Sequence, residues 1–465
     1  MVERLSVQSV SFIVMLLMAN VLTPADYGLV GMIVVFIDVA QSLVDSGFSQ
    51  ALIRKQDRNT VDMSTVFYFN IAFGLLFYFI LYFSAPLIAD FYNQPELVIL
   101  TRVVSLCVIF NSFVLVQKAL LTSDLDFKTQ ARVSLIASIA SGTLGIILAY
   151  SRVGVWAIVV YQLSNVFLSA ALLWLYSKWR PIYSFSWTSF KELFGFGSKL
   201  AIAGLINTLY SNLYLIVIGK LFRASELGYY TRANQFGSFL SVNFTTVLQR
   251  VAFPVLCKVR EDKHVLTNGY RSFISLTAFL VFPVMIGTVV MARQLILMVL
   301  NDEWLPVVPL LQILCFSFML YPVQAINLNL LQVEGRSDLF LRLEIIKKII
   351  GAIILVCSIS YGIFVMCYGL VLSSIINLVI NTYYTGKLIG LGLFKQLKDL
   401  LPSFVYSLTM GIVVYWVIDC FEVLWIQLII GIGVGVLWYF GLAILTGSKE
   451  LKKMIELIKG LRKPE

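Results

Sequence analysis

Polar side chains recur along one face of an otherwise apolar segment between residues 232 and 250. At 100° per helical residue, five polar residues and Phe239 fall within about 80° of one another: Arg232, Gln235, Phe239, Asn243, Thr246 and Arg250. An arginine stands near each end of this stripe. The planar guanidinium donates two parallel hydrogen bonds, so it suits the oxygens of phosphate or pyrophosphate. The stripe therefore predicts one wall of a water-filled cavity that binds a phosphate group.

Three further apolar segments carry polar residues that could line the same cavity. Residues 28–49 place acids, an amide and hydroxyls on one helix face, namely Asp38, Gln41, Ser42, Asp45 and Ser49. Residues 199–223 supply Asn207, Tyr210, Ser211 and Tyr214, followed by Lys220 and Arg223. Residues 363–386 supply Ser374, Asn377, Asn381 and Tyr384. Polar residues inside membrane helices are costly, so their clustering indicates a binding pathway.

Each of these residues has a role that its chemistry suits. We expect Arg232, Arg250, Lys220 and Arg223 to bind pyrophosphate. The amides, tyrosines and serine can hydrogen-bond to sugar hydroxyls. The candidates for sugar binding are Asn207, Tyr210, Ser211, Tyr214, Gln235, Asn243, Asn377 and Asn381. Asp38 and Asp45 suit a coupling proton or cation. Structural roles stay open: the polar groups could pair across helix interfaces, Asp38 and Asp45 could pair with arginines, and Arg250 and Lys220 could extend to the membrane boundary.

No set of residues indicates an enzyme or a metal site. His264 is the single histidine, and the six cysteines stand singly, nearly all in apolar segments. That spacing matches neither a metal site nor a disulfide framework. The connections hold no phosphate-cradling glycine-rich loop and no nucleophile–base–acid set. We therefore expect a protein that is not an enzyme and that uses no cofactor or metal.

The composition places the polar stripes in a membrane. The 465 residues are 59% hydrophobic and 13% charged, against about 45–50% and about 25% in globular chains. Apolar stretches repeatedly reach the roughly 20 residues that cross a hydrocarbon core as a helix. The expected spans are residues 5–22, 28–46, 63–85, 98–120, 131–150, 154–177, 199–219, 236–256, 270–292, 307–331, 345–361, 363–386, 400–419 and 424–446. The prediction is an all-α integral membrane protein with about fourteen transmembrane helices.

The positions of lysine and arginine predict the orientation, because cytoplasmic loops carry an excess of both. With the N-terminus in the cytoplasm, all but six of the 35 basic residues fall on the inner side. The exceptions are Arg102, Arg152, Lys220, Arg223, Arg232 and Arg293. The net charge of +10 is thereby explained without a nucleic-acid partner. We expect a multi-pass protein with both termini in the cytoplasm and membrane lipids as its surroundings.

Two halves of the chain resemble each other. Leu22–Gly28 (LTPADYG) matches Phe222–Gly228 (FRASELG) at an offset of 200 positions, and weaker matches follow at offsets of 208 and 210. The repeats share one orientation, which is the layout of alternating-access transporters built from parallel halves. We expect an N-terminal lobe at 1–180, an amphipathic cytoplasmic linker at 181–198 and a C-terminal lobe at 199–390. A helix pair at 391–447 and a basic amphipathic cytoplasmic tail at 448–465 would follow, the tail lying on the anionic inner leaflet or binding a partner.

Short motifs spread over the whole chain carry a family resemblance. They are Leu22–Gly28, Asp45–Arg54 (DSGFSQALIR), Gly154–Ala157 (GVWA), Trp179–Pro181 (WRP), Phe253–Pro254 with Lys258–Asp262 (KVRED), and Leu331–Arg336 (LQVEGR). In this order, and with a plan of twelve helices plus two, the sequence resembles Wzx-type polysaccharide flippases, particularly the branch with colanic acid exporters. The charged first-helix motif of the related lipid II flippase is absent. Members usually carry further residues before the first helix, so we expect the natural start to lie upstream.

The resemblance implies the fold of the multidrug/oligosaccharidyl-lipid/polysaccharide (MOP) exporter superfamily. It also implies the translocation of an undecaprenyl-pyrophosphate-linked oligosaccharide across a bacterial inner membrane for O-antigen, capsule or exopolysaccharide synthesis, and polysaccharide polymerase machinery as a partner. A multidrug or cation antiporter of the same superfamily is the nearest alternative. A polytopic polymerase or ligase would need a large outer loop with catalytic residues, which the sequence lacks. A non-transporting scaffold would leave the polar stripes unexplained.

Overall fold

The computed structural model describes residues 2–45, 47–55 and 57–461, without the side chains of residues 2–5, 247, 250, 251, 337 and 457–461. The described residues form helices and their connections and contain no β-strand. The chain divides into two compact units, Met1–Thr231 and Arg232–Glu465. The boundary lies inside one helix, Ala224–Lys258. Each unit is described by itself.

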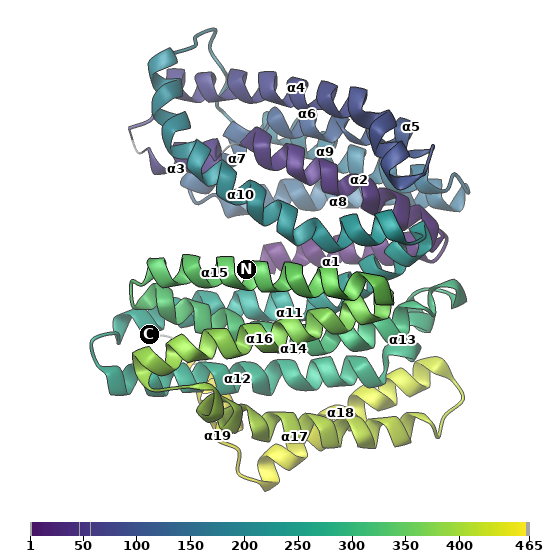
Figure 1. Ribbon diagram of the computed structural model, residues 1–465, viewed down its shortest axis with the longest axis vertical. Helices are drawn as coiled ribbons and strands as arrows, with labels where there is room; N and C mark the ends of the chain where they lie inside the picture. Colours follow the sequence, from purple (N-terminus) through teal and green to yellow (C-terminus); the bar gives the residue numbers. More distant parts are fainter. Residues whose placement is uncertain (1, 46, 56, 462–465) are drawn as a thin grey trace. The chain divides into compact units, whose positions relative to one another are not determined.

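The described residues of the first unit form ten helices and the start of an eleventh, and Figure 1 shows these elements. They are α1 (Val2–Ala19), α2 (Pro24–Asp45), α3 (Phe48–Arg54), α4 (Thr60–Tyr92), α5 (Leu97–Val104), α6 (Leu106–Ser112), α7 (Leu115–Ser123), α8 (Phe127–Tyr150), α9 (Val155–Tyr176), α10 (Trp187–Leu221) and the first residues of α11 (Ala224–Lys258). α2 packs along α10 and also contacts α4, α6 and α9, while α8 packs between α1 and α9.

Glycines let the helices of this unit approach closely. A Cβ atom at Gly142 of α8 would lie 2.4 Å from Val14 of α1, and one at Gly145 would lie 2.8 Å from Tyr161 of α9. Membrane helices gain little from the hydrophobic effect against lipid, so close backbone packing at small residues stabilises their association. These two glycines therefore hold α8 against both of its neighbours.

A reciprocal glycine contact joins the starts of α2 and α11. A Cβ at Gly28 would lie 1.8 Å from the carbonyl oxygen of Ala224, and a Cβ at Gly228 would lie 2.0 Å from that of Pro24. Pro24 and Ala224, like Gly28 and Gly228, are equivalent positions of the internal repeat. The two helix starts therefore cross in a symmetric, backbone-to-backbone contact that only glycine allows.

The second unit holds the remainder of α11 and the helices that follow it (Figure 1). They are α12 (Lys263–Val290), α13 (Ala292–Val299), η1 (Asp302–Trp304), α14 (Val307–Val333), α15 (Ser337–Ser358), η2 (Ile359–Tyr361), α16 (Ile363–Ile389), α17 (Leu393–Ile418), α18 (Leu424–Leu445) and α19 (Lys449–Leu461). α12 packs against α14 and α17, α14 against α16, and α18 against α17. Gly237 of α11 accommodates the ring of Phe318 on α14, which would lie 2.6 Å from a Cβ there.

A helix or a run of consecutive helices lies at every predicted span, and the all-α membrane fold is confirmed. Among the described residues, ten helical segments are long and apolar enough to cross a membrane, or eleven if the bent run Leu97–Ser112 and Leu115–Ser123 is one span. Three helices, α1, α11 and α15, are not both long and apolar enough over their described residues to be counted as spans. The apolar part of α1 is short, the polar stripe lowers the hydropathy of α11, and charges interrupt α15. The count of fourteen therefore stays a prediction.

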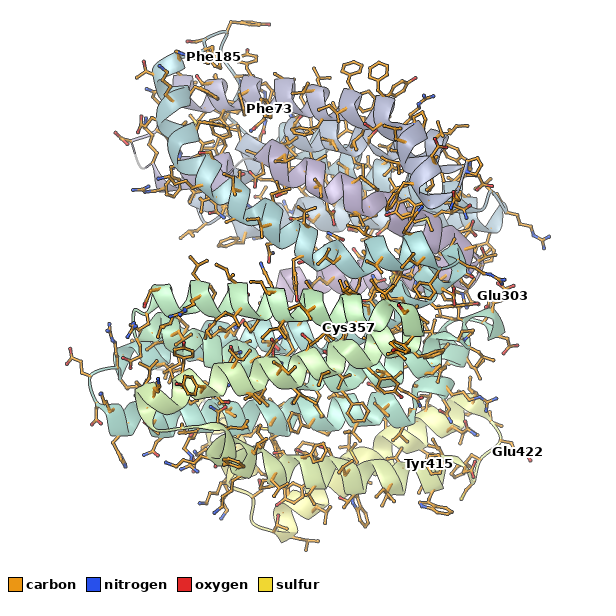
Figure 2. The ribbon with its side chains drawn as sticks, in the orientation of Figure 1. Phe73, Phe185, Glu303, Cys357, Tyr415 and Glu422 are labelled. Carbon is orange, nitrogen blue, oxygen red and sulfur yellow. The ribbon has the colours of Figure 1, made fainter. Side chains whose placement is uncertain are left out.

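Large apolar side chains point away from the helices over much of the surface. Tyr415 and Trp416 of α17 are 59% and 68% exposed, and the labelled Tyr415 projects outward (Figure 2). Leu437 of α18 is similarly exposed. Water would penalise so much exposed apolar area, whereas hydrocarbon does not. The outer faces of α17 and α18 therefore suit contact with lipid.

Candidate functional site

Three polar cavities lie within the first unit. One of about 430 Å³, the acidic cavity, lies between α2 and α10. It is lined by Asp38, Gln41, Ser42, Asp45, Asn207, Thr208, Ser211 and Asn212. Four of the predicted site residues, Asp38, Asp45, Asn207 and Ser211, thus meet in one place. The two carboxylates are the charged groups among the described residues of this lining, so the acidic cavity favours a cation or a proton.

The other two cavities lie in the same unit. The middle cavity, about 370 Å³, is lined by Val34, Ile37, Asp38, Gln41, Val104, Cys107, Asn111, Tyr161, Gln162, Asn165 and Val166. The lysine cavity, about 420 Å³, is lined by Asn111, Lys118, Thr122, Gln130, Val133, Ser134, Asn165, Val166, Ser169 and Leu173. Cavities of this size with a few convergent polar groups are typical ligand sites.

Shared lining residues show that the three cavities are neighbours, and we call this series of cavities the path. Asp38 and Gln41 line both the acidic and the middle cavity, while Asn111 and Asn165 line both the middle and the lysine cavity. The Asn111 side chain donates to Gln41 Oε1 at 3.2 Å. Asn165 donates to Ser141 Oγ at 3.0 Å, which fixes its amide between α9 and α8. Amides therefore line each pair of neighbouring cavities.

Hydrogen bonds orient both acids. Asn212 of α10 donates to Asp38 Oδ2 at 3.4 Å, and Ser49 of α3 donates to Asp45 Oδ1 at 2.7 Å. The two carboxylates stand on one face of α2, seven residues or about two helical turns apart. Each of these hydrogen bonds uses one carboxylate oxygen, so the other oxygen of each acid can bind a proton or cation in the acidic cavity.

Tyr210 and Tyr214 of α10 are not among the lining of the three cavities. The ring of Tyr214 stacks on that of Tyr230, with centroids 6.2 Å apart and an interplanar angle of 14°. A stacked ring is held by its neighbour, so this contact gives Tyr214 a packing role beside the role in sugar binding that the sequence predicts.

Two predicted phosphate ligands lie at helix ends instead of in these cavities. Lys220 Nζ donates to the carbonyl oxygen of Phe91 at 2.5 Å and lies 4.8 Å from the centroid of that ring. A lysine at the last carbonyls of a helix is stabilised by the helix dipole, so Lys220 caps the C-terminal end of α4. Arg223 is exposed, and its backbone N–H donates to Glu226 at the start of α11.

Arg232 lies deep in the second unit. Its side chain is 3% exposed, donates to Gln235 Oε1 at 2.7 Å and places its guanidinium 5.9 Å from the centroid of Trp304. Asn243 donates to the carbonyl oxygen of Phe239 on its own helix. The side chain of Arg250 lies outside the described part of the structure. Arg232 would have to leave its packed position to contact a ligand, so its role in pyrophosphate binding stays a prediction.

The predicted amides of α16 lie in the packed interior of the second unit. Asn381 is 2% exposed, and its backbone carbonyl accepts from Thr385. Thr385 also donates to Asn327 Oδ1, which accepts from Gln396 of α17. Asn377 is half-buried on the same helix. These contacts fit a polar network that joins α14, α16 and α17.

Sequence reasoning missed Asn111, Lys118 and Asn165. Lys118 counted only as a positive charge on the inner side. One signal was available in α9, where Gln162, Asn165 and Ser169 follow one another at intervals of three and four, so they share a helix face. All three line the middle or the lysine cavity.

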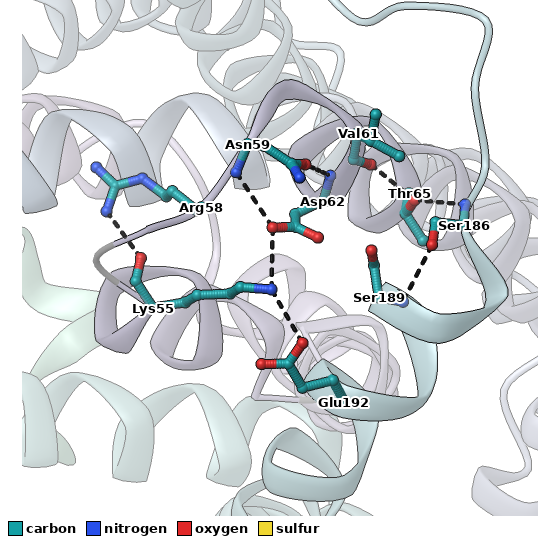
Figure 3. A network of polar contacts seen from close by, with 9 residues as sticks. All are labelled: Lys55, Arg58, Asn59, Val61, Asp62, Thr65, Ser186, Ser189 and Glu192. Carbon is teal, nitrogen blue, oxygen red and sulfur yellow. Dashed lines mark hydrogen bonds and ion pairs between the residues drawn. The ribbon is translucent and has the colours of Figure 1, made fainter.

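A second polar network fastens the start of α10 to α4 (Figure 3). Lys55 Nζ lies 3.1 Å from Asp62 Oδ2 and 2.9 Å from Glu192 Oε2. Asn59 and Asp62 form a capping box, each side chain accepting from the other's backbone N–H. The Ser186 N–H donates to Thr65 Oγ1 at 3.0 Å. Segments that the sequence assigns to the linker and to the N-terminal lobe are therefore held together at this end of the unit.

The sequence was compared with models of known protein families. A family model described as "Polysaccharide biosynthesis protein" matches residues 17–309, which is more than half of the chain. The chain belongs to this family. The resemblance read from the sequence motifs is thereby confirmed. The match covers every residue that lines the three cavities.

Curated relatives of this polysaccharide biosynthesis protein span nearly its whole length. The teichuronic acid biosynthesis protein TuaB of Bacillus subtilis is 28% identical over 89% of this chain and 88% of its own. The lipopolysaccharide biosynthesis protein WzxC of Escherichia coli is 24% identical over 86% and 83%. The succinoglycan biosynthesis transport protein ExoT of Rhizobium meliloti is 22% identical over 97% and 92%.

Solved structures share the fold. The lipid II flippase MurJ in an inward closed conformation matches with a TM-score of 0.76 at 17% identity, covering 95% of this chain and 97% of its own. An inward-facing multidrug transporter of the MATE family, within the MOP superfamily, matches with a TM-score of 0.64 at 14% identity, covering 82% and 95%. The polysaccharide biosynthesis protein therefore has a MOP-type fold, as the sequence resemblance implies.

Proposed function

We propose that this polysaccharide biosynthesis protein is a flippase for a lipid-linked oligosaccharide. The observation that carries the proposal is the path of three polar cavities inside a unit built from membrane-crossing helices. Apolar helices alone would need no such path, and buried polar groups in a membrane are costly unless they serve a ligand. The amides at the junctions suit sugar hydroxyls, so the headgroup would pass the membrane along the cavities while the prenyl chain stays in lipid.

The proposed substrate is an undecaprenyl-pyrophosphate-linked glycan in the bacterial inner membrane. The names of the relatives TuaB, WzxC and ExoT concern polysaccharide synthesis or its transport, and the structural relative MurJ is named a lipid II flippase. The basic residues on one side of the predicted topology support cytoplasmic termini. Alternating access between the predicted lobes, with polysaccharide polymerase machinery downstream, completes the proposal.

Reconstitution tests the proposal directly. The protein is placed in proteoliposomes with a fluorescent prenyl-pyrophosphate-linked glycan, and arrival of the label at the opposite leaflet is measured by a membrane-impermeant quencher. We expect flipping by the intact protein and at least a tenfold loss in Arg232→Ala/Arg250→Ala. Arg336→Ala is the matched control, because Arg336 is exposed and pairs with Asp338 beside it. If the double variant flips the glycan at the wild-type rate, neither arginine is needed to bind the phosphates. If the intact protein does not flip the glycan, the proposed function is overturned.

The acidic cavity favours a second candidate, a multidrug or cation antiporter. Asp38 and Asp45 are the charged groups of its described lining, and a carboxylate pair attracts cations. In the flippase, the same pair would bind the coupling proton or cation. Uptake of a cationic dye into proteoliposomes separates the two: dye exchange lost in Asp38→Asn, without glycan flipping by the intact protein, would favour the antiporter.

A further inference from the structure

The lysine cavity holds a single charge in neutral polar surroundings. Among the described residues that line it, Lys118 is the charged one, and six others are amides or hydroxyls: Asn111, Thr122, Gln130, Ser134, Asn165 and Ser169. None of the ion pairs formed by the described residues involves Lys118. Lys118 is exposed, so an anion that enters the cavity can reach its ammonium group.

The cavity is built rigidly around Lys118. Gln130 of α8 donates to Thr122 Oγ1 at 2.9 Å and to the Lys118 carbonyl oxygen at 3.3 Å, so it ties α7 to α8. Asn165 of α9 is held by Ser141 of α8. These bonds orient the walls, while the Lys118 ammonium group keeps its three donors for a ligand.

We propose that the lysine cavity binds the pyrophosphate of the lipid-linked substrate, with Lys118 as its cationic ligand. The proposal rests on the flippase function and adds the place and the direction of binding. Asp38 and Asp45 in the acidic cavity repel an anion, whereas Lys118 attracts it. The pyrophosphate therefore binds first at Lys118, and the uncharged sugars extend past Asn111 and Asn165. By the predicted orientation, Lys118 lies toward the cytoplasmic side, where the substrate would enter.

Binding in nanodiscs tests the site apart from transport. The probes are undecaprenyl pyrophosphate and undecaprenol, which share the chain and differ in the phosphates, and affinity is measured by thermophoresis of labelled protein. We expect Lys118→Met to weaken undecaprenyl pyrophosphate binding at least tenfold, to leave undecaprenol binding unchanged, and Lys118→Arg to retain most of the affinity. Lys128→Met is the matched control, because Lys128 is exposed at the start of the next helix, α8, and does not line the cavity.

Two competitors identify what the cavity recognises. If excess phosphatidylglycerol displaces undecaprenyl pyrophosphate, the site accepts any anionic lipid and the proposal is overturned. If inorganic pyrophosphate displaces it and phosphatidylglycerol does not, the proposal is supported. Equal affinity in Lys118→Met and the wild-type protein, or no measurable wild-type binding, would also overturn it. If Lys118-dependent binding is found but the intact protein does not flip the glycan, the site stands and the flippase function fails. If the protein flips the glycan and Lys118→Met binds and flips normally, only this inference fails.

Discussion

The side-chain amide of Asn111 donates a 3.2 Å hydrogen bond to the side-chain oxygen of Gln41 where the middle cavity adjoins its two neighbours. Asn111 belongs to α6 and Gln41 to α2, so the bond crosses the path between helices that are separated in the sequence. A headgroup that moves along the path must pass this pair. A substitution in this pair therefore tests the proposed route of the headgroup through the first unit.

Asn111→Leu replaces the amide by an apolar side chain of similar size. We expect at least a tenfold loss of glycan flipping, because two cavities lose a shared polar group, with a loss of about 1 kcal/mol in stability from the missing hydrogen bond. Proteoliposome flipping and thermal unfolding measure the two effects. Asn268→Leu, at an exposed asparagine of α12, is the control. Normal flipping by Asn111→Leu would exclude this route for the substrate.

Gly28→Ala and Gly228→Ala place a methyl group against a backbone carbonyl. Because the new Cβ would lie 1.8 Å or 2.0 Å from that oxygen, the helix starts must separate, at a cost of about 1–3 kcal/mol each. We expect a lower unfolding temperature in both variants. Gly433→Ala serves as the control, since a Cβ there meets no atom within 4 Å and alanine stabilises a helix by about 0.5–1 kcal/mol. Equal behaviour of the three variants would argue against the reciprocal contact.

Arg271 of α12 forms a bidentate pair with Asp399 of α17. The distances are 2.7 Å from Nε and 2.6 Å from Nη2 to the two carboxylate oxygens. A lysine cannot reproduce this geometry, so Arg271→Lys should lower stability by on the order of 1 kcal/mol. A double-mutant cycle with Asp399→Asn measures the coupling by thermal unfolding. The exposed pair Arg336 and Asp338 should show no measurable coupling in the same experiment, and a larger value there than for Arg271 and Asp399 would refute the comparison.

We expect the ion pair of Lys55 to make the stability of the protein fall at alkaline pH. Its hydrogen bond to Glu192 raises the pKa of Lys55 above the ordinary value of 10.5. The folded state therefore holds this proton more tightly than the unfolded state, so the stabilisation is complete below pH 10.5 and is lost as the pH rises through the raised pKa. Lys55→Arg keeps its charge and should lose less stability than the wild-type protein at a pH of about 11.5. Lys128→Arg is the control, and an alkaline loss in Lys55→Arg as large as in the wild type would contradict the prediction.

Much of the fold was predictable from the sequence because the physical constraints are local. A run of apolar residues in lipid has to satisfy its own backbone, so helices lie at every predicted span. The repeat between Leu22–Gly28 and Phe222–Gly228 marked both helix starts. Periodicity also placed Asp38 and Asp45 on one face of α2 and Asn207 and Ser211 on one face of α10. These four residues line one cavity because α2 and α10 pack together.

The rest depended on tertiary structure. Residues 97–123 form three short helices with a bend of 43° in the run, so a single helical period could not show which way Asn111 and Lys118 face. Arg232 is buried beside Trp304, which is distant in the sequence. Sequence alone determined that the chain is helical and membrane-embedded and which helix faces are polar. Only the packing of helices decided which of those faces meet to enclose a cavity, because that choice rests on contacts between segments far apart in the chain.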